Sequence, residues 1–134
     1  MAMHIVLGGA HNGKRALVRD YLGRNGLTYA WLSDGIENWD QKTDVLVIDS
    51  ILQVLFPMTR EQRINWLETY ILPISNVIWI IEDVSRGIVP MEKHKRSYRD
   101  ESGRITQLLV EKATSVAQVW YGLVEMRKGE SLWE

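Results

Sequence analysis

The chain contains no cysteine, and only three of its 134 residues are prolines and three are histidines. The absence of cysteine excludes disulfides, thiolate metal sites and a cysteine nucleophile, and it suits a reducing compartment. No apolar run approaches the roughly 20 residues of a membrane span. The N-terminus also lacks the basic-then-apolar layout of a signal peptide. We therefore expect a cytoplasmic protein with no membrane span.

Neither sign of charge is in excess, because 16 Lys and Arg residues face 17 Asp and Glu residues, for a net charge of −1. The chain thus has no overall basic field that would attract a nucleic acid. A hydrophobic content of 46% and a charged content of 25% are typical of a globular protein. Because no linker or repeat interrupts the sequence, we expect residues 1–134 to form one domain.

Near-continuous runs of Val, Ile and Leu alternate with segments of helical periodicity, a pattern that predicts a parallel sheet covered on both faces. Thr59 and Gln62 form a capping-box pattern, and Pro73 closes the helix that they begin. Strands are expected at 4–7, 27–32, 44–49, 76–81 and 116–121, with helices at 14–25, between Thr59 and Pro73, and at 91–113. Polar loop is expected at 33–43, a short helical turn at 50–56, a split helix at Gly103 and a polar tail after 121.

The six tryptophans do not by themselves distinguish core packing from ligand binding. Trp79 and Trp120 fall within strand patterns, so we predict that both lie in the core. The others fit core or partly buried packing better than a ligand pocket or a subunit contact. These are Trp31, Trp39, Trp66 and Trp133.

The first expected strand leads into Gly8-Gly-Ala-His-Asn-Gly-Lys14, which has the spacing of a phosphate loop. The two flanking glycines tolerate unusual backbone angles, so the amides between them can form an anion nest at the positive end of the next helix. Lys14 supplies a mobile charge for the β and γ phosphates of ATP or GTP. A chance glycine turn is the alternative interpretation. The predicted nucleotide-binding residues are Gly8, Gly9, Ala10, His11, Asn12, Gly13, Lys14 and Arg15.

Arg15 departs from the phosphate-loop pattern, in which a Ser or Thr after the lysine ligates Mg²⁺. A guanidinium repels the ion and cannot coordinate it. Three interpretations stay open: water and acids elsewhere hold Mg²⁺, Arg15 takes over part of its charge-neutralising role, or nucleotide turnover is lost. A fourth is that Arg15 only extends a solvated basic face with Arg19.

Acidic residues end two of the expected parallel strands, at the sheet edge where ligands bind in such folds. Asp49 is predicted to hold Mg²⁺ through water, although a strand-end aspartate can equally cap the next helix. Asp83 is predicted to act with Lys14 and Asp49 in catalysis. The adjacent acids Glu82 and Asp83 are as often solvated as catalytic.

Three segments together resemble the adenosylcobinamide kinase / adenosylcobinamide-phosphate guanylyltransferase family of cobalamin synthesis. They are Gly8 to Arg15, Asp83-Val-Ser-Arg-Gly-Ile-Val-Pro90, and Tyr98-Arg-Asp100 followed by Gly103-Arg-Ile-Thr-Gln107. The match covers roughly the first 30 residues and most of the second half, and the order of the motifs is specific. The resemblance implies a RecA-like P-loop NTPase fold of three layers, with a mostly parallel sheet of about five strands, and a homo-oligomer.

The resemblance also implies a chemistry in two steps. A kinase step moves the γ-phosphoryl group of ATP or GTP to the cobinamide hydroxyl, and a second step attaches GMP through a guanylylated histidine. The family places that histidine after the second strand, where Ser33 to Thr43 contains none, and His4, His11 and His94 match no such position. Asp83, Ser85 and Thr106 also replace the family's Glu, Gly and Asn. The guanylyltransferase half is therefore expected to be absent.

Two hypotheses follow. The first is a phosphotransferase acting on a corrinoid or another small alcohol, with Lys14 neutralising phosphate, Asp49 organising Mg²⁺ and Asp83 orienting the acceptor hydroxyl. The second is a degenerate, non-catalytic nucleotide- or phosphate-binding module with a regulatory or assembly role. The sequence leaves both open.

Overall fold

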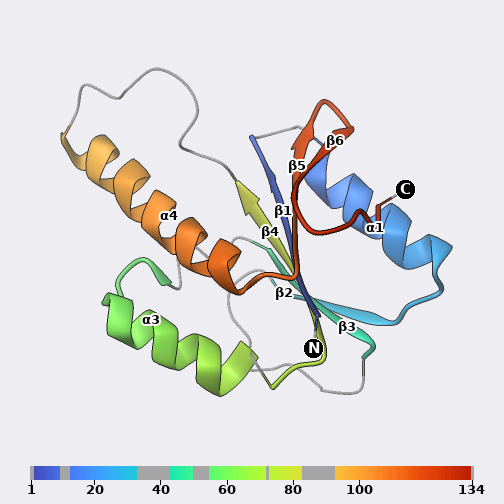
Figure 1. Ribbon diagram of the computed structural model, residues 1–134, viewed down its shortest axis with the longest axis horizontal. Helices are drawn as coiled ribbons and strands as arrows, with labels where there is room; N and C mark the ends of the chain where they lie inside the picture. Colours follow the sequence, from blue (N-terminus) through green and yellow to red (C-terminus); the bar gives the residue numbers. More distant parts are fainter. Residues whose placement is uncertain are drawn as a thin grey trace.

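The computed structural model of the chain describes residues 2–9, 13–32, 43–49, 55–71, 73–82 and 93–133, without the side chains of 93–99. Strands and helices alternate along most of this length (Figure 1). The elements are β1 (Ala2–Gly8), α1 (Lys14–Arg24), β2 (Tyr29–Leu32), β3 (Val45–Asp49), α3 (Arg60–Trp66), the π-helical turn η1 (Leu67–Ile71), β4 (Asn76–Glu82), α4 (Lys93–Lys112), β5 (Ser115–Trp120) and β6 (Leu123–Lys128).

The sheet has the strand order β2-β3-β4-β1-β5-β6. The first five strands in this order run parallel, and only β6 runs antiparallel, against β5. The strand β4 thus lies between β1 and β3. This arrangement confirms the predicted RecA-like α/β fold with a mostly parallel sheet, although the sheet has six strands rather than about five.

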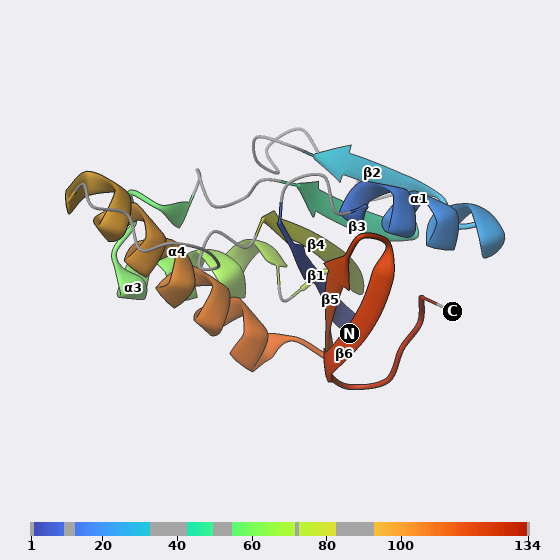
Figure 2. The same cartoon turned by 90° about the horizontal axis from the view of Figure 1, so that it is seen from above.

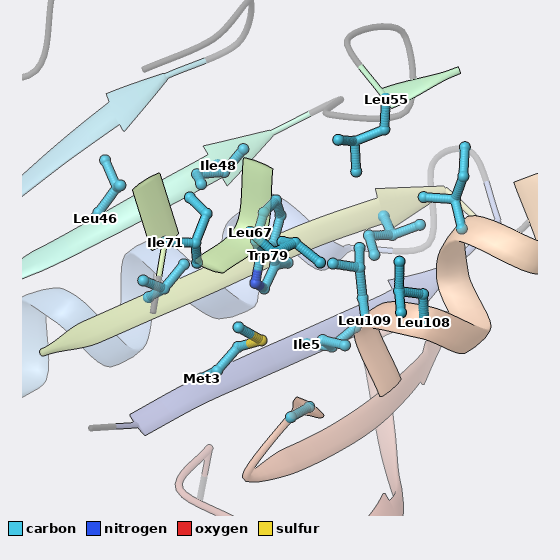
Figure 3. Packing of buried hydrophobic residues seen from close by; sticks show 14 of the residues in the cluster. Met3, Ile5, Leu46, Ile48, Leu55, Leu67, Ile71, Trp79, Leu108 and Leu109 are labelled. Carbon is cyan, nitrogen blue, oxygen red and sulfur yellow. The ribbon is translucent and has the colours of Figure 1, made fainter. Parts of the chain in front are cut away.

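Helices cover both faces of the sheet, as the continuous apolar strands predicted (Figure 2). On one face, Val18 and Leu22 of α1 pack into a cluster with Val6, Val47 and Ile80. On the other face, η1 and α4 pack on a second, larger cluster (Figure 3). The two clusters place the helices in separate layers, with the sheet between them.

The larger cluster is centred on β4 and β1. Trp79 is fully buried, as predicted, and it packs with Ile5, Leu67 and Leu109 (Figure 3). Neighbouring residues alternate between the two clusters along β4, because successive side chains of a strand point to opposite faces. The apolar side chains of β4 therefore hold both helical layers on the sheet.

The local start signals of the helices act as predicted. The Thr59 side chain accepts a hydrogen bond from the backbone N–H of Gln62, and the Gln62 side chain accepts one from the Thr59 N–H, which completes the capping box. The helix α4 runs unbroken through Gly103, so the predicted split is wrong. A single glycine costs a helix only about 1 kcal/mol. The buried Ile105 and Leu109 hold this part of α4 on the sheet.

The polar tail predicted after residue 121 is wrong, because Leu123–Lys128 forms β6 and pairs with β5. The prediction that Trp120 lies in the core is also wrong, since 60% of its surface is exposed. Trp120 is the last residue of β5, where the chain turns into β6. Farther on, Trp133 is buried against Tyr21 of α1, with ring centroids 5.2 Å apart.

Several predictions fall where the structure gives no description. These are the polar loop 33–43 except for Thr43, Trp39, and the turn 50–56 except for Leu55 and Phe56. Within the described ranges, no helix is both long enough and apolar enough to cross a bilayer. The one-domain organisation stays a prediction.

The layer that contains α3 and α4 is tied together by Arg63, whose side chain is buried. Its guanidinium donates hydrogen bonds to the carbonyl oxygens of Leu55 (2.8 Å) and Phe56 (2.9 Å). It also donates to the carboxylate of Glu101 on α4. Arg104, one turn along α4, binds the other oxygen of Glu101 at 2.8 Å. The hydrogen bond with Arg63 is the main reason why the pKa of Glu101 is lowered.

We expect Glu101→Gln to lower the free energy of unfolding by about 1–2 kcal/mol at neutral pH, because a charge-assisted bond to a buried arginine is lost. The pKa of Glu101 is lowered on folding, so its stabilisation is complete above the ordinary glutamate value of 4.5. It is lost as the pH falls through the lowered folded value. Urea unfolding of the wild type and the variant should therefore converge in acid. Glu111→Gln, an exposed change on the same helix, is the control, and an equal effect of both changes would contradict the assignment.

Candidate phosphate-binding site

The strand β1 ends at Gly8, at the carboxyl edge of the sheet, with β4 on one side and β5 on the other. Gly8 is in register with Glu82, the last residue of β4. On the other side, a Cβ built on Gly8 would lie 2.7 Å from the carbonyl oxygen of Val119 in β5 and 3.2 Å from the Lys14 Cγ. The strand end therefore leaves no room for a side chain, and the lysine stem passes directly over Gly8.

Gly13, with a φ of 91°, is the N-cap residue of α1 and provides no side-chain hydrogen bond to the helix. The first turn of α1 contains no acidic residue. Because no acidic side chain of that turn offsets it, the positive end of the helix dipole favours an anion at this position. The predicted loop residues Ala10, His11 and Asn12 lie outside the described part of the chain, and the anion nest stays a prediction.

Lys14 is only 3% exposed, although it carries a charge. Its Nζ donates a hydrogen bond of 2.6 Å to the carbonyl oxygen of Gly9. Burial lowers the pKa of Lys14, while the negative charges of Glu82 and Asp49 raise it and the Arg15 charge lowers it. The ammonium group thus lies folded over the start of the loop, where a phosphate could replace the carbonyl as its partner.

Arg15 reaches across the sheet edge to Asp49, the last residue of β3. Its Nε and Nη2 donate to the two carboxylate oxygens at 2.7 and 3.0 Å. Trp31 of β2 donates its indole N–H to one of these oxygens at 3.2 Å. Arg19, one turn along α1, lies over the Trp31 ring with its Cζ 4.4 Å from the centroid. Arg15 therefore belongs to a connected network, and the interpretation of a merely solvated basic face is wrong.

The Arg15–Asp49 pair connects the two positions from which a phosphate-loop protein would hold Mg²⁺. The hydrogen bond with Asp49 raises the pKa of Arg15, so the guanidinium stays charged. Both oxygens of Asp49, which is 7% exposed, accept bonds from this cation. Within the described residues, no group of three or more acidic or histidine side chains could hold a metal ion. These residues do not fit Mg²⁺, although the role of Asp49 as a metal ligand stays a prediction.

The fold brings together Gly8, Lys14, Arg15 and Asp49, whereas Asp83 lies outside the described residues. The position of Gly9 follows from its bond with Lys14. Glu82 and Trp31 were not predicted as site residues. The register of β4 with β1 and of β2 with β3 places them there, and no local motif indicates either role.

His4 and Arg104 have their partners outside this site. His4 is half-buried in β1, with its Nδ1 2.6 Å from the hydroxyl oxygen of Ser115, and burial lowers its pKa. Arg104 is paired with Glu101. The side chains of His94, Arg96 and Arg99 are not described.

We expect Gly8→Ala to lower the free energy of unfolding by about 1–3 kcal/mol, because the added Cβ overlaps the Val119 carbonyl and presses on the Lys14 stem. Gly23→Ala is the matched control, since a Cβ at Gly23 would have no neighbour within 4 Å. It should stabilise the helix by about 0.5–1 kcal/mol. Thermal and urea unfolding measure both effects, and equal stability of the two variants would contradict the close contact.

Comparison with known protein families identifies the family of the chain. The model of a family described as cobinamide kinase / cobinamide phosphate guanyltransferase matches residues 28–126, well over half of the chain. The matched segment begins after α1, so the phosphate loop is supported by its own pattern and geometry. The comparison with curated proteins finds no match. The description of the family names a kinase and a guanyltransferase, activities that use nucleotides. The chain therefore belongs to the nucleotide-binding cobinamide kinase / cobinamide phosphate guanyltransferase family.

Proposed function

We propose that this chain binds the phosphates of ATP or GTP without a magnesium ion and holds the nucleotide without transferring its phosphoryl group. The observation that carries the proposal is the two-bond ion pair between Arg15 and Asp49. A permanent cation thereby takes the place in which a phosphate loop otherwise holds a metal. The proposed role is that of a regulatory or assembly module derived from the family's enzymes.

Each described part of the loop contributes to phosphate binding in this proposal. Lys14 exchanges its bond with the Gly9 carbonyl for a bond with phosphate, since a charge-assisted partner is the stronger one. The amides at the start of α1 supply neutral donors. The Arg15 side chain is 48% exposed while it holds Asp49, so it remains accessible to an anion.

A second candidate function is a residual phosphotransferase acting on a corrinoid or another small alcohol. Glu82 favours it, because this exposed carboxylate ends β4 beside Gly8, close to the Lys14 charge. In this alternative, Asp49 organises Mg²⁺ and Asp83 orients the acceptor hydroxyl. The guanylyltransferase activity is excluded from both proposals, since no histidine stands where the family places its nucleophile. A cytoplasmic location and a homo-oligomer accompany both as predictions.

Isothermal titration with ATP and GTP separates the two functions. We expect binding that changes less than about twofold when Mg²⁺ is added or chelated, with no nucleoside diphosphate formed. Lys14→Met should weaken binding at least about tenfold, because it removes the charge and keeps the apolar stem. The control is Lys112→Met, a change at the end of α4, near the amino end of β1. Binding that needs Mg²⁺, together with product formation that Lys14→Met abolishes, would favour the kinase instead.

Replacing Arg15 tests the ion pair itself. We expect Arg15→Ser to weaken nucleotide binding in the absence of Mg²⁺ and to restore it when Mg²⁺ is added, a difference of about tenfold or more. The serine supplies a hydroxyl ligand and releases Asp49 from the guanidinium. Adding Asp49→Asn to Arg15→Ser should remove the magnesium response. Affinities of Arg15→Ser that equal those of the wild type under both conditions would contradict the substitution of a metal by the arginine.

A further inference from the structure

Two exposed aromatic side chains stand side by side where β5 turns into β6. Trp120 is 60% exposed and Tyr121 is 76% exposed, and their ring centroids lie 5.3 Å apart. Leu123, which follows across the turn, is 70% exposed. Exposed apolar surface of this kind is typical of a binding site. Neither ring belongs to the two hydrophobic clusters that the described residues form.

The turn lies directly beside the phosphate loop. The parallel pairing of β1 with β5 places the Val119 carbonyl against Gly8, one residue before Trp120. A Cβ built on Gly13 would lie 3.6 Å from the backbone of Gly122 in the turn. Figures 1 and 2 agree, since both views show the red hairpin turn next to the amino end of α1. The turn that carries the aromatic pair therefore lies beside the start of α1.

The strand order also fixes on which side of the loop the aromatic pair lies. Asp49 ends β3, on one side of β1, while Trp120 ends β5, on the other side. Arg15 and Asp49 mark the side with the fixed cation, which suits the terminal phosphates with their greater negative charge. A nucleotide with its terminal phosphates on that side would have its ribose and base on the side of β5.

The geometry of the turn does not account for the tyrosine. Tyr121 has a φ of 49° and Gly122 a φ of 79°, so both central residues of this two-residue hairpin lie in the left-handed region. Asn-Gly is the sequence that such a turn favours, whereas a bulky residue adopts this conformation only with strain. Tyr121 is the one non-glycine residue with positive φ in the described ranges. Because the backbone conformation disfavours a tyrosine here, we attribute the presence of Tyr121 to its exposed ring.

We propose that Trp120 and Tyr121 form the stacking platform for the nucleobase of the nucleotide whose phosphates occupy the loop, an inference that rests on the proposed nucleotide binding. Every base offers a flat π face, so a platform of this kind binds adenine and guanine alike. Stacking selects for the presence of a base and discriminates little between the bases. The loop thus holds the phosphates, and the hairpin holds the base.

The experiment compares nucleotides with base-free tripolyphosphate on the full chain, by isothermal titration. Trp120→Thr and Tyr121→Asn should each weaken ATP and GTP binding roughly tenfold, and change tripolyphosphate binding by less than about twofold. Both variants preserve the hairpin, because threonine suits an exposed strand position and Asn-Gly suits the turn. Tyr70→Asn replaces an exposed tyrosine of η1 and is the control, with no expected change.

The remaining outcomes are distinct. If the variants bind ATP and GTP as the wild type does, or lose tripolyphosphate equally, the platform is overturned while the proposed nucleotide binding stands. A change in oligomeric state by light scattering, with nucleotide affinity unchanged, would also overturn it and assign the pair to a contact with a second copy. Failure of the wild type to bind both nucleotides and tripolyphosphate would overturn the proposed function together with the platform.

Discussion

The central position of β1 in the sheet is the constraint on which the candidate site depends. This strand is buried between β4 and β5, and its register with them decides what surrounds its last residue. Gly8 consequently lies between Glu82 and the Val119 carbonyl, with the Lys14 stem across it. The loop that follows must start from this crowded point and end at α1, whose Val18 and Leu22 are fixed in the core.

The second feature is the ion pair between Arg15 and Asp49. A hydroxyl after Lys14 would leave Asp49 to a cation from solvent, whereas Arg15 brings its own cation and binds the carboxylate with two hydrogen bonds. The planar guanidinium matches a carboxylate in a way that a lysine could not. Trp31 adds a third donor and lies under Arg19, so the pair is held from two strands and one helix. A site of this kind has its positive charge in place before any ligand arrives.

Most of the fold could be predicted from local patterns, because continuous apolar runs, a capping box and strand-end glycines carry their physical meaning within a few residues. The failures also have local causes. Gly103 suggested a break, but Ile105 and Leu109 pack well enough to outweigh its weak helix propensity. The strand β6 was missed because Tyr121 is an unusual residue in a tight turn. Trp120 fits a strand pattern, yet a pattern does not reveal which strand positions the tertiary structure leaves exposed.

The candidate site likewise has features that the sequence predicts and features that only the fold decides. The sequence by itself predicted the phosphate loop, and it determined that a lysine and then Arg15 follow Gly13 and that Ser33 to Thr43 contains no histidine, since these are matters of residue identity and spacing. Only the tertiary structure decided that Arg15 binds Asp49, that Trp31 and Glu82 border the site, and that the turn at Tyr121 lies beside Gly13. These contacts join residues far apart in the chain. They follow from the order and register of the strands, which non-local packing fixes and no single segment encodes.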